Sequence, residues 1–207
     1  RYKRDDNTEI IYGLRSTLYR YEGYFKPVIE PRIQFNKYLE NRDVFKAGYS
    51  RHNQFVDQLN ITGAGIADLV WVPATKNIAP QTSDIIEAGY EKRLGTEYSF
   101  ISNAYFKRYT NLSTVSNVGD IDAGGDWESA VIKGTGSAYG LELLVQKNKG
   151  VFSGWLSYTI GRSTRNFPDL FEDDFLFTQD RTHMVKLYLG LTTLDDWNYG
   201  INYLIGS

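Results

Sequence analysis

The segment Ser137-Ala-Tyr-Gly-Leu-Glu-Leu-Leu-Val-Gln-Lys147 decides the fold, because its side chains alternate between apolar and polar. In an extended chain, one face of this segment carries Tyr139, Leu141, Leu143 and Val145. The opposite face carries Gly140, Glu142 and Gln146, with Leu144 as the exception. A period of two sustained over about ten residues predicts a β-strand with two unlike faces.

The same period of two recurs along the whole chain, and no stretch shows a convincing helical period. It is clear at 184–191 and at 197–205. Noisier alternation lies at 8–21, 28–39, 44–58, 84–94, 97–111 and 151–164. The sequence therefore predicts an all-β protein of about nine strands, several of them longer than the usual five or six residues.

The predicted connections are of two kinds, and the two kinds alternate. Short polar turns lie at 40–43, 94–96, 148–150 and 194–196, and long connections lie at about 60–83, 113–136 and 167–181. Soluble domains rarely contain structureless loops of more than about 12–15 residues. Outer-membrane barrels combine short periplasmic turns with long extracellular loops. We therefore expect an antiparallel transmembrane β-barrel segment, with the short turns at one end and the long connections at the other.

An aromatic residue follows each short turn, namely Phe45, Tyr98, Phe152 and Trp197. Strands that leave one membrane face would hold these residues at a common height, as an interfacial girdle. The alternative is that aromatic residues are simply common in strands. An eleven-residue strand rises about 36 Å, and a tilt near 40° reduces its height to about 28 Å, which suits a bilayer. Nine strands is an odd number, whereas bacterial barrels use even numbers, so we expect residues 1–207 to form part of one larger barrel domain.

Composition excludes several functional classes. The chain has no cysteine and only two histidines, His52 and His183, which argues against thiol chemistry and against a metal site built from this chain alone. Lys and Arg total 23 against 25 Asp and Glu, so no basic footprint suggests a nucleic-acid partner. No nucleophile elbow or supported triad occurs. We expect no enzyme activity, no catalytic residue and no cofactor.

Two further motifs have simple structural interpretations. The run Gly134–Gly140 lacks the Lys-Ser/Thr pair of a phosphate-binding loop and leads into a strand, so we interpret it as a flexible start to that strand. The run Asp120–Asp126, followed by Glu128, lacks the bidentate Glu of an EF-hand and is interpreted as a solvated acidic loop, with weak calcium binding as the alternative. Glu172–Asp174 is interpreted in the same way.

Several segments, taken in order, resemble the C-terminal half of the barrel of TonB-dependent outer-membrane receptors of the Bacteroidota type. These receptors carry a carboxypeptidase-regulatory-like domain at the N-terminus. The segments are Val28–Arg32, Lys46–Arg51, Leu69–Gln81, Gly136–Glu142, Gly154–Thr159, Phe167-Pro168 and Asp180–His183. Each segment is loosely defined alone, and their order along nearly the whole chain is the more specific feature.

The resemblance implies a 22-stranded barrel closed by an N-terminal plug in the outer membrane of a Gram-negative bacterium. It further implies import of a scarce nutrient, such as an iron chelate, a vitamin, an oligosaccharide or a peptide, driven by the TonB complex. Outer-membrane lipids and a surface lipoprotein would be its other partners. The plug and the earlier strands would lie outside residues 1–207, and Ser207 stands where such barrels usually end on an aromatic residue.

Loops on a rigid scaffold commonly carry recognition, so the candidate ligand contacts are aromatic and charged residues of the long connections. They are Trp71, Lys76, Trp127, Asp173, Phe175 and Arg181. At the last of these positions the alternative is that Asp180 and Arg181 only hold the loop in place. Two other functions remain open: a non-transport barrel that scaffolds a secretion or surface assembly, and a soluble carbohydrate-binding β-sandwich.

Overall fold

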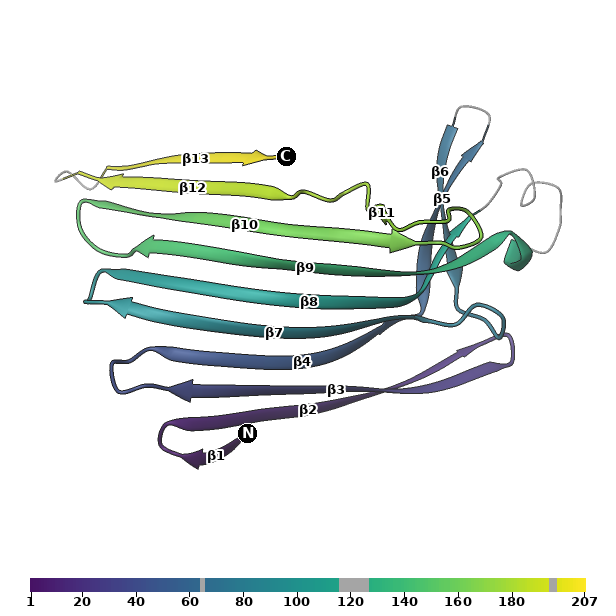
Figure 1. Cartoon of the computed structure of the whole chain (residues 1–207), viewed down its shortest axis with the longest axis horizontal. Coiled ribbons are helices and arrows are strands. Elements are labelled where there is room, and N and C mark those ends of the chain that lie inside the picture. The colour runs from purple at the N-terminus through teal and green to yellow at the C-terminus, as the bar shows by residue number, and fades with distance from the viewer. Residues whose placement is uncertain (64–65, 116–126, 194–196) are drawn as a thin grey trace.

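The computed structural model describes residues 1–63, 66–115, 127–193 and 197–207, without the side chains of 60–69. The described chain forms one large antiparallel sheet and a separate two-stranded hairpin (Figure 1). In the sheet, the strands follow the order β1-β2-β3-β4-β7-β8-β9-β10-β12-β13, and β11 pairs with β10. The fold is therefore all-β, as the alternation predicted, and β1 and β13 form the two edges of an open sheet.

Nine long strands make up most of this sheet. They are β2 (Thr8–Tyr21), β3 (Tyr24–Tyr38), β4 (Val44–Gln54), β7 (Gln81–Leu94), β8 (Tyr98–Val115), β9 (Val131–Lys147), β10 (Phe152–Asn166), β12 (His183–Thr192) and β13 (Asn198–Gly206). The smaller elements are β1 (Tyr2–Asp5), β5 (Val56–Gly63), β6 (Ile66–Pro73), the 3-10 turn η1 (Trp127–Ala130) and β11 (Phe175–Leu176). Among the described residues, no helix is long and apolar enough to cross a membrane.

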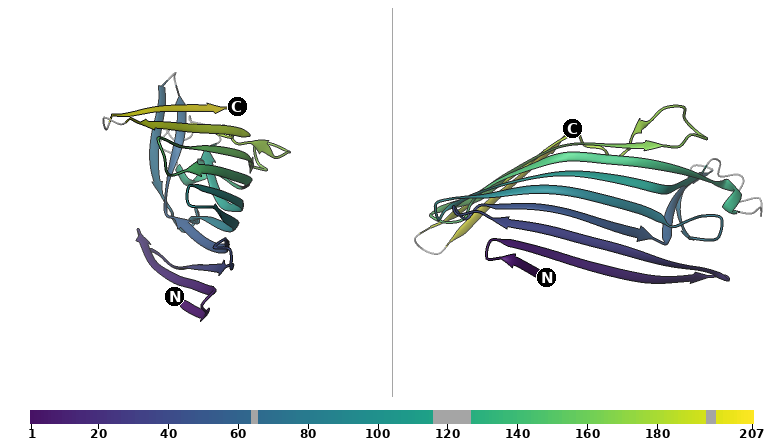
Figure 2. Two further views of the ribbon diagram at one scale, coloured as in Figure 1. Left: turned by 90° about the vertical axis from the view of Figure 1, so that its left-hand side faces the viewer. Right: turned by 60° about the horizontal axis from the view of Figure 1, so that its bottom comes forward.

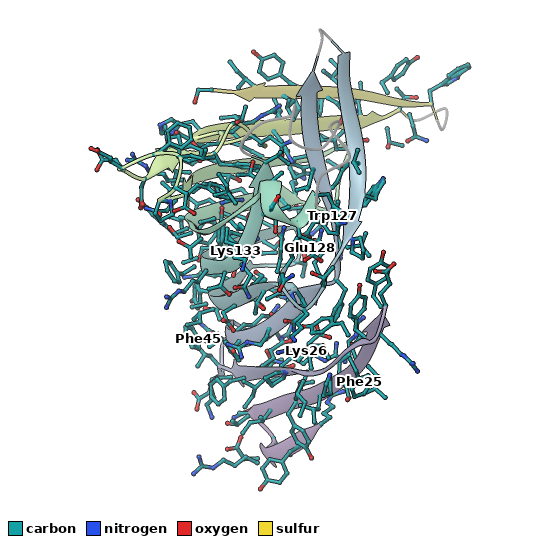
Figure 3. All side chains as sticks on the ribbon, turned by 90° about the vertical axis from the view of Figure 1, so that its right-hand side faces the viewer. Phe25, Lys26, Phe45, Trp127, Glu128 and Lys133 are labelled. Carbon is teal, nitrogen blue, oxygen red and sulfur yellow. The ribbon has the colours of Figure 1, made fainter. Side chains whose placement is uncertain are left out.

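The sheet is bent into an arc, and its two faces differ in character (Figure 2). Cross-strand partners share a face, so the register extends each face across the whole sheet. One such row joins Leu143 of β9 to Tyr158 of β10 and Val185 of β12. The row beside it joins Glu142 to Thr159 and Met184 on the opposite face. Phe45, from the apolar set, lies on the convex side, and Lys26, from the polar set, lies on the concave side (Figure 3).

The convex face carries nearly all of the exposed large apolar side chains of the sheet. Examples from five strands are Leu14 (69% exposed), Ile33 (51%), Ile86 (58%), Leu189 (53%) and Ile201 (68%). Leu141, Leu143, Leu187 and Leu189 share this face, while Glu142 and Lys186 lie on the concave face. The predicted separation of the two side-chain sets is therefore confirmed on strands β9 and β12.

The concave face carries nearly all of the glycines in the strands of the main sheet, and large side chains lie over them. Gly140 and Gly161 are cross-strand partners, and the Tyr105 ring and hydroxyl lie close to both. Gly190 and Gly200 are likewise partners, and Tyr188 lies over that pair. The predicted flexible start of a strand at Gly134–Gly140 is wrong, because the run lies within β9. Because the glycines of this run have no Cβ, side chains from neighbouring strands and connections can lie directly against their backbone.

The two ends of the sheet differ as the alternating connections predicted. The turns β3–β4, β7–β8 and β9–β10 lie at one end, and the connections β4–β7, β8–β9 and β10–β12 lie at the other (Figure 1). We call these the short-turn end and the long-connection end. Turn 194–196 and residues 116–126, including the acidic run Asp120–Asp126, lie outside the described residues. The aromatic residues Phe45, Tyr98, Phe152 and Trp197 are all exposed at the short-turn end.

Three local predictions are wrong. The expected strand 44–58 ends at Gln54, and most of the long connection 60–83 is the β5–β6 hairpin rather than a loop. This hairpin stands on the concave side of the sheet, at its long-connection end (Figure 2). The alternation of short and long connections also fails once, because β2 and β3 are joined at the long-connection end by the two-residue turn Glu22–Gly23. Both turn residues have positive φ (42° and 83°), as a tight hairpin requires.

We expect Gly140→Ala to destabilise the fold by about 1–3 kcal/mol, as overpacking does in other well-packed sites. A Cβ at Gly140 would lie 2.7 Å from the Ile160 carbonyl oxygen and 2.8 Å from the Tyr105 hydroxyl. The matched control is Gly206→Ala on the same face, where the nearest atom lies at 3.4 Å and no cost is expected. Thermal unfolding of the intact protein, followed by circular dichroism, measures both. Equal midpoints for the two variants would contradict close packing over Gly140.

Candidate functional site

The β5–β6 hairpin is fixed at its base by an aromatic contact with β2. The Tyr19 ring stacks on Phe55 with a centroid distance of 4.7 Å, and its edge meets Tyr24 at 6.3 Å. The Tyr19 hydroxyl donates a hydrogen bond to the Ala74 carbonyl (2.9 Å). Phe55 and Ala74 flank the hairpin and are joined by a backbone hydrogen bond of 2.7 Å. Tyr19 therefore connects the β2–β3 hairpin with the β5–β6 hairpin across the concave side.

The segment after β6 is a compact turn built around Thr75. The Thr75 hydroxyl accepts hydrogen bonds from the backbone N–H groups of Asn77 (3.2 Å) and Ile78 (3.1 Å). Thr75 N–H in turn donates to the Ile78 carbonyl (2.9 Å). Ile78 is 3% exposed and Ala74 is 5% exposed, so this turn is among the few places where the described chain buries apolar side chains completely. The turn therefore presents Lys76 from a fixed backbone.

Three segments that are distant in sequence meet around Lys76. The β2–β3 turn, the segment after β6 and η1 line a hollow of about 680 Å³ at the long-connection end. Its lining includes Tyr21, Tyr24, Phe25, Lys76 and Glu128. The Asn77 side-chain amide donates a hydrogen bond to Glu128 Oε2 (2.5 Å), which fastens η1 to the turn. We call this hollow the rim site. Figure 3 shows Phe25 and Glu128 at this end of the sheet.

The rim site combines aromatic surface with one cation and two carboxylates, those of Glu22 and Glu128. Tyrosine rings with free edges and a lysine bind ligands by stacking and by charge-assisted hydrogen bonds. Among the described residues, no cluster of three His, Asp or Glu side chains could hold a metal ion. The aromatic rings and charged groups of the rim site suit the binding of a polar ligand.

The structure brings only part of the predicted contact set to the rim site. Lys76 lines it, and Trp127 begins η1 directly before Glu128. Trp71 is 64% exposed on β6 and does not line the hollow. Asp173, Phe175 and Arg181 lie on the β10–β12 connection at the same end of the sheet, and none of them lines the hollow.

Within the β10–β12 connection, the predicted contacts have different surroundings. Phe175 packs against Phe171 (4.9 Å between centroids) and Phe167 (6.2 Å), so it holds the connection together. Asp180 accepts a hydrogen bond from the Ser163 backbone N–H at 2.5 Å, as expected for a residue that holds the loop in place. Arg181 makes no ion pair with any described carboxylate. Asp173 is exposed.

Sequence reasoning missed the contribution of the β2–β3 turn. Tyr21 and Tyr24 follow the strand alternation and so appear to be ordinary strand residues. The only local signal was Glu22-Gly23, which favours a tight turn between two strands. Nothing in the sequence indicated that this turn would lie beside Lys76, because that contact depends on a hairpin fifty residues further along the chain.

A buried carboxyl lies at the base of the β5–β6 hairpin. Asp57 of β5 is 5% exposed, and its Oδ1 has no hydrogen-bond partner among the described residues. Burial raises the pKa of Asp57 above its ordinary value of 3.8, and the side chains of Gln81, Ser113 and Gln54 oppose this increase only in part. The ionised form of Asp57 therefore destabilises the docked hairpin relative to the neutral form.

We expect hairpin docking to be strongest in acid and to weaken as pH rises from 3.8 through the raised pKa of Asp57, because the carboxylate must then be buried with its charge. Asp57→Asn should remove this pH dependence and protect the hairpin at neutral pH. Hydrogen exchange of β5 and β6, corrected for intrinsic rates, measures it. Asp173→Asn, an exposed carboxyl elsewhere, is the control. If wild-type protection is the same at pH 4 and pH 8, burial of an ionised Asp57 has no energetic cost.

Comparison with known proteins identifies no relative. No family model matches the chain, and neither does any curated protein or solved structure. The function proposed below is therefore inferred from the faces, edges and rim site of the chain, together with the family resemblance described above.

Proposed function

We propose that this chain forms part of the wall of an outer-membrane β-barrel, and that the barrel is a TonB-dependent receptor that imports a scarce nutrient. The observation that carries the first half of the proposal is the apolar band on the convex face. No described segment covers this layer of side chains, and the concave face of the same sheet is polar. Such a surface is unstable in water and suits a hydrocarbon solvent.

Charged side chains bound this apolar band at both ends. On β7, Ile86, Ala88 and Tyr90 lie between Asp84 and Lys92. The register extends both boundaries to neighbouring strands: Arg51, Arg108 and Arg162 lie at the long-connection end, and Lys37 and Lys147 lie at the short-turn end. Between the two charged boundaries each strand carries apolar or small side chains on this face.

The height of the band agrees with a bilayer. On β9 the band covers Tyr139 to Val145, between Ser137 and Lys147. The ten steps from Ser137 to Lys147, the polar residues that bound the band, rise about 33 Å at about 3.3 Å each, and a strand tilt near 40° reduces this distance between the polar boundaries to about 25 Å. Transmembrane barrels carry an apolar band about 25 Å tall with aromatic residues at its borders. Phe45, Tyr98, Phe152 and Trp197 supply such a border at the short-turn end.

The receptor half of the proposal is supported by the long-connection end. A receptor needs a recognition surface on the outside, and the β5–β6 hairpin, η1 and the rim site all lie at this end. The concave face is polar, as the inner wall of a water-filled or plugged barrel must be. Energy from the TonB complex, a plug and a lipoprotein partner enter the proposal through the family resemblance alone.

The two rival functions differ from the receptor in identifiable ways. A soluble sandwich needs a second layer over the apolar face. In the described chain, the β5–β6 hairpin and η1 lie on the concave side instead (Figures 2 and 3). A non-transport scaffold shares the wall and differs only in what the rim site does, so an uptake measurement separates it from a receptor.

We expect tryptophan at position 187 to be quenched by brominated lipid, because Leu187 lies on the convex face beside Leu156 and Tyr203. Tryptophan at position 186, on the concave face, should not respond. The two variants, Leu187→Trp and Lys186→Trp, change adjacent positions on opposite faces. The fluorescence of each variant in vesicles is compared with that of the intact parent protein. Quenching at 186 alone would place the wrong face in lipid, and quenching at neither position would contradict a membrane wall.

We expect the double variant Tyr24→Ala/Lys76→Ala to lose uptake of one nutrient, because both side chains line the rim site. Cells that lack the gene are complemented with each variant and grown with an iron chelate, a vitamin, an oligosaccharide or a peptide as the limiting nutrient. The control is Lys149→Ala at the short-turn end, which should restore growth as the wild type does. If gene loss slows growth on none of the four classes, the scaffold alternative is favoured.

A further inference from the structure

A second hollow lies on the convex face, at the long-connection boundary of the apolar band. It has a volume of about 350 Å³, and its lining includes Phe106 and Arg108 of β8, Ser137 of β9, and Thr164 and Asn166 of β10. The β10–β12 connection leans to this side of the sheet and contributes Asp174 to the lining (Figure 2). The hollow is separate from the rim site, which lies between the β2–β3 turn, the segment after β6 and η1.

Arg108, at this boundary, forms no ion pair with its acidic neighbour Asp84. Asp84 is its cross-strand partner on β7, and Asp84 is already bound by two hydrogen bonds from Arg51 (2.8 and 2.9 Å) and one from Tyr49 (2.6 Å). Neither Arg108 nor Arg162 forms an ion pair with a carboxylate among the described residues, and both side chains are exposed. Two guanidinium groups are therefore available on this face.

Hydroxyl groups lie between the two arginines. Arg108 pairs with Ser137 and Ser137 pairs with Thr164, while Arg162 lies two residues before Thr164 on the same strand and face. The two hydroxyls are 3.1 Å apart. Strands β8 and β10 are about 10 Å apart across β9, a distance that two extended arginine side chains can bridge around one anion. The remaining carboxyl of the hollow, Asp174, is bound to the Asn166 amide at 2.5 Å.

The residues just inside this boundary are apolar or aromatic. Phe106 is 46% exposed and Tyr139 is 49% exposed, and they are cross-strand partners on the row below Arg108 and Ser137. Leu141 continues the surface towards the centre of the band. A group that binds the arginines would therefore have an apolar surface directly on its membrane side.

We propose that this hollow and the row beside it bind the phosphate group of a membrane lipid. Arg108 of the lining and Arg162 of the adjoining row hold the phosphate, and the acyl chains lie along Phe106 of the lining and along Tyr139 and Leu141 next to it. The inference rests on the proposed membrane wall. Arginine forks match phosphate oxygens and form charge-assisted hydrogen bonds, and the neighbouring hydroxyls add donors. The combination of an anion site with an apolar surface favours a lipid headgroup over free phosphate.

The test measures lipid binding to the intact detergent-solubilised protein by native mass spectrometry, with dioleoylphosphatidic acid as the probe. We expect Arg108→Gln/Arg162→Gln to weaken its binding by about tenfold or more, since two charge-assisted contacts are lost. Dioleoylglycerol has the same chains without phosphate, and its binding should not change. Each single variant should weaken binding of the phosphatidic acid by a smaller factor than the double variant does. The single variants therefore test the proposal if the double variant does not fold.

The matched control is Lys107→Gln/Lys186→Gln, which removes the same charge from the concave face. This variant should bind the phosphatidic acid as the parent does. Equal loss in the control would show a general charge effect and overturn the site, and unchanged binding in the arginine variants would also overturn it. Inorganic phosphate that binds as tightly as the lipid would overturn the lipid assignment.

The outcome is distinguishable from failure of the proposed function. If Leu187→Trp is quenched by brominated lipid but the arginine substitutions have no effect, the membrane wall is supported and only the lipid site is overturned. A protein with no quenching loses the membrane wall, and the lipid assignment with it.

Discussion

When a sheet bends, side chains on its inner face are pressed together and those on its outer face spread apart. In this chain the inner face meets that constraint by pairing glycines with large side chains. Tyr105 lies over Gly140 and Gly161, and Tyr188 lies over Gly190 and Gly200. The outer face needs no such device and carries bulky apolar residues instead. The curvature, the polar inner face and the apolar outer face therefore depend on one distribution of residues along each strand.

The antiparallel sheet with two unlike faces could be predicted from the sequence, because alternation of side chains is a local signal. Alternation within Ser137–Lys147 is enough to separate Leu141 from Glu142, and hairpin pairing carries that separation to neighbouring strands. The ends of the sheet could be predicted for the same reason, since a short polar turn leaves no other way to join adjacent antiparallel strands. The β5–β6 hairpin was missed because its strands are short and because a single residue, Phe55, separates β5 from β4.

The rim site could be predicted only in part, because contacts between connections that are distant in the sequence leave no local sequence pattern. Lys76 was identifiable as a charged residue of a long connection, but its neighbours Tyr21 and Tyr24 come from the distant β2–β3 turn. Tyr19 shows the difficulty most clearly. It obeys the strand period, and its role in holding Phe55 and Ala74 depends on where the hairpin stands after folding.

The order of strands in the main sheet has a consequence for assembly. Among the described strands, almost every one pairs with its neighbour in the chain, and the order is interrupted by the β5–β6 hairpin and by the short strand β11, which pairs with β10 beside the main path. A sheet with this order can form one hairpin at a time, and each new strand then finds its partner already at the growing edge. At each stage the outermost strand presents a row of unpaired N–H and C=O groups, as β1 and β13 do in the described sheet. An open edge of this kind pairs readily with other chains, so its N–H and C=O groups must be paired or covered for the sheet to stay unaggregated.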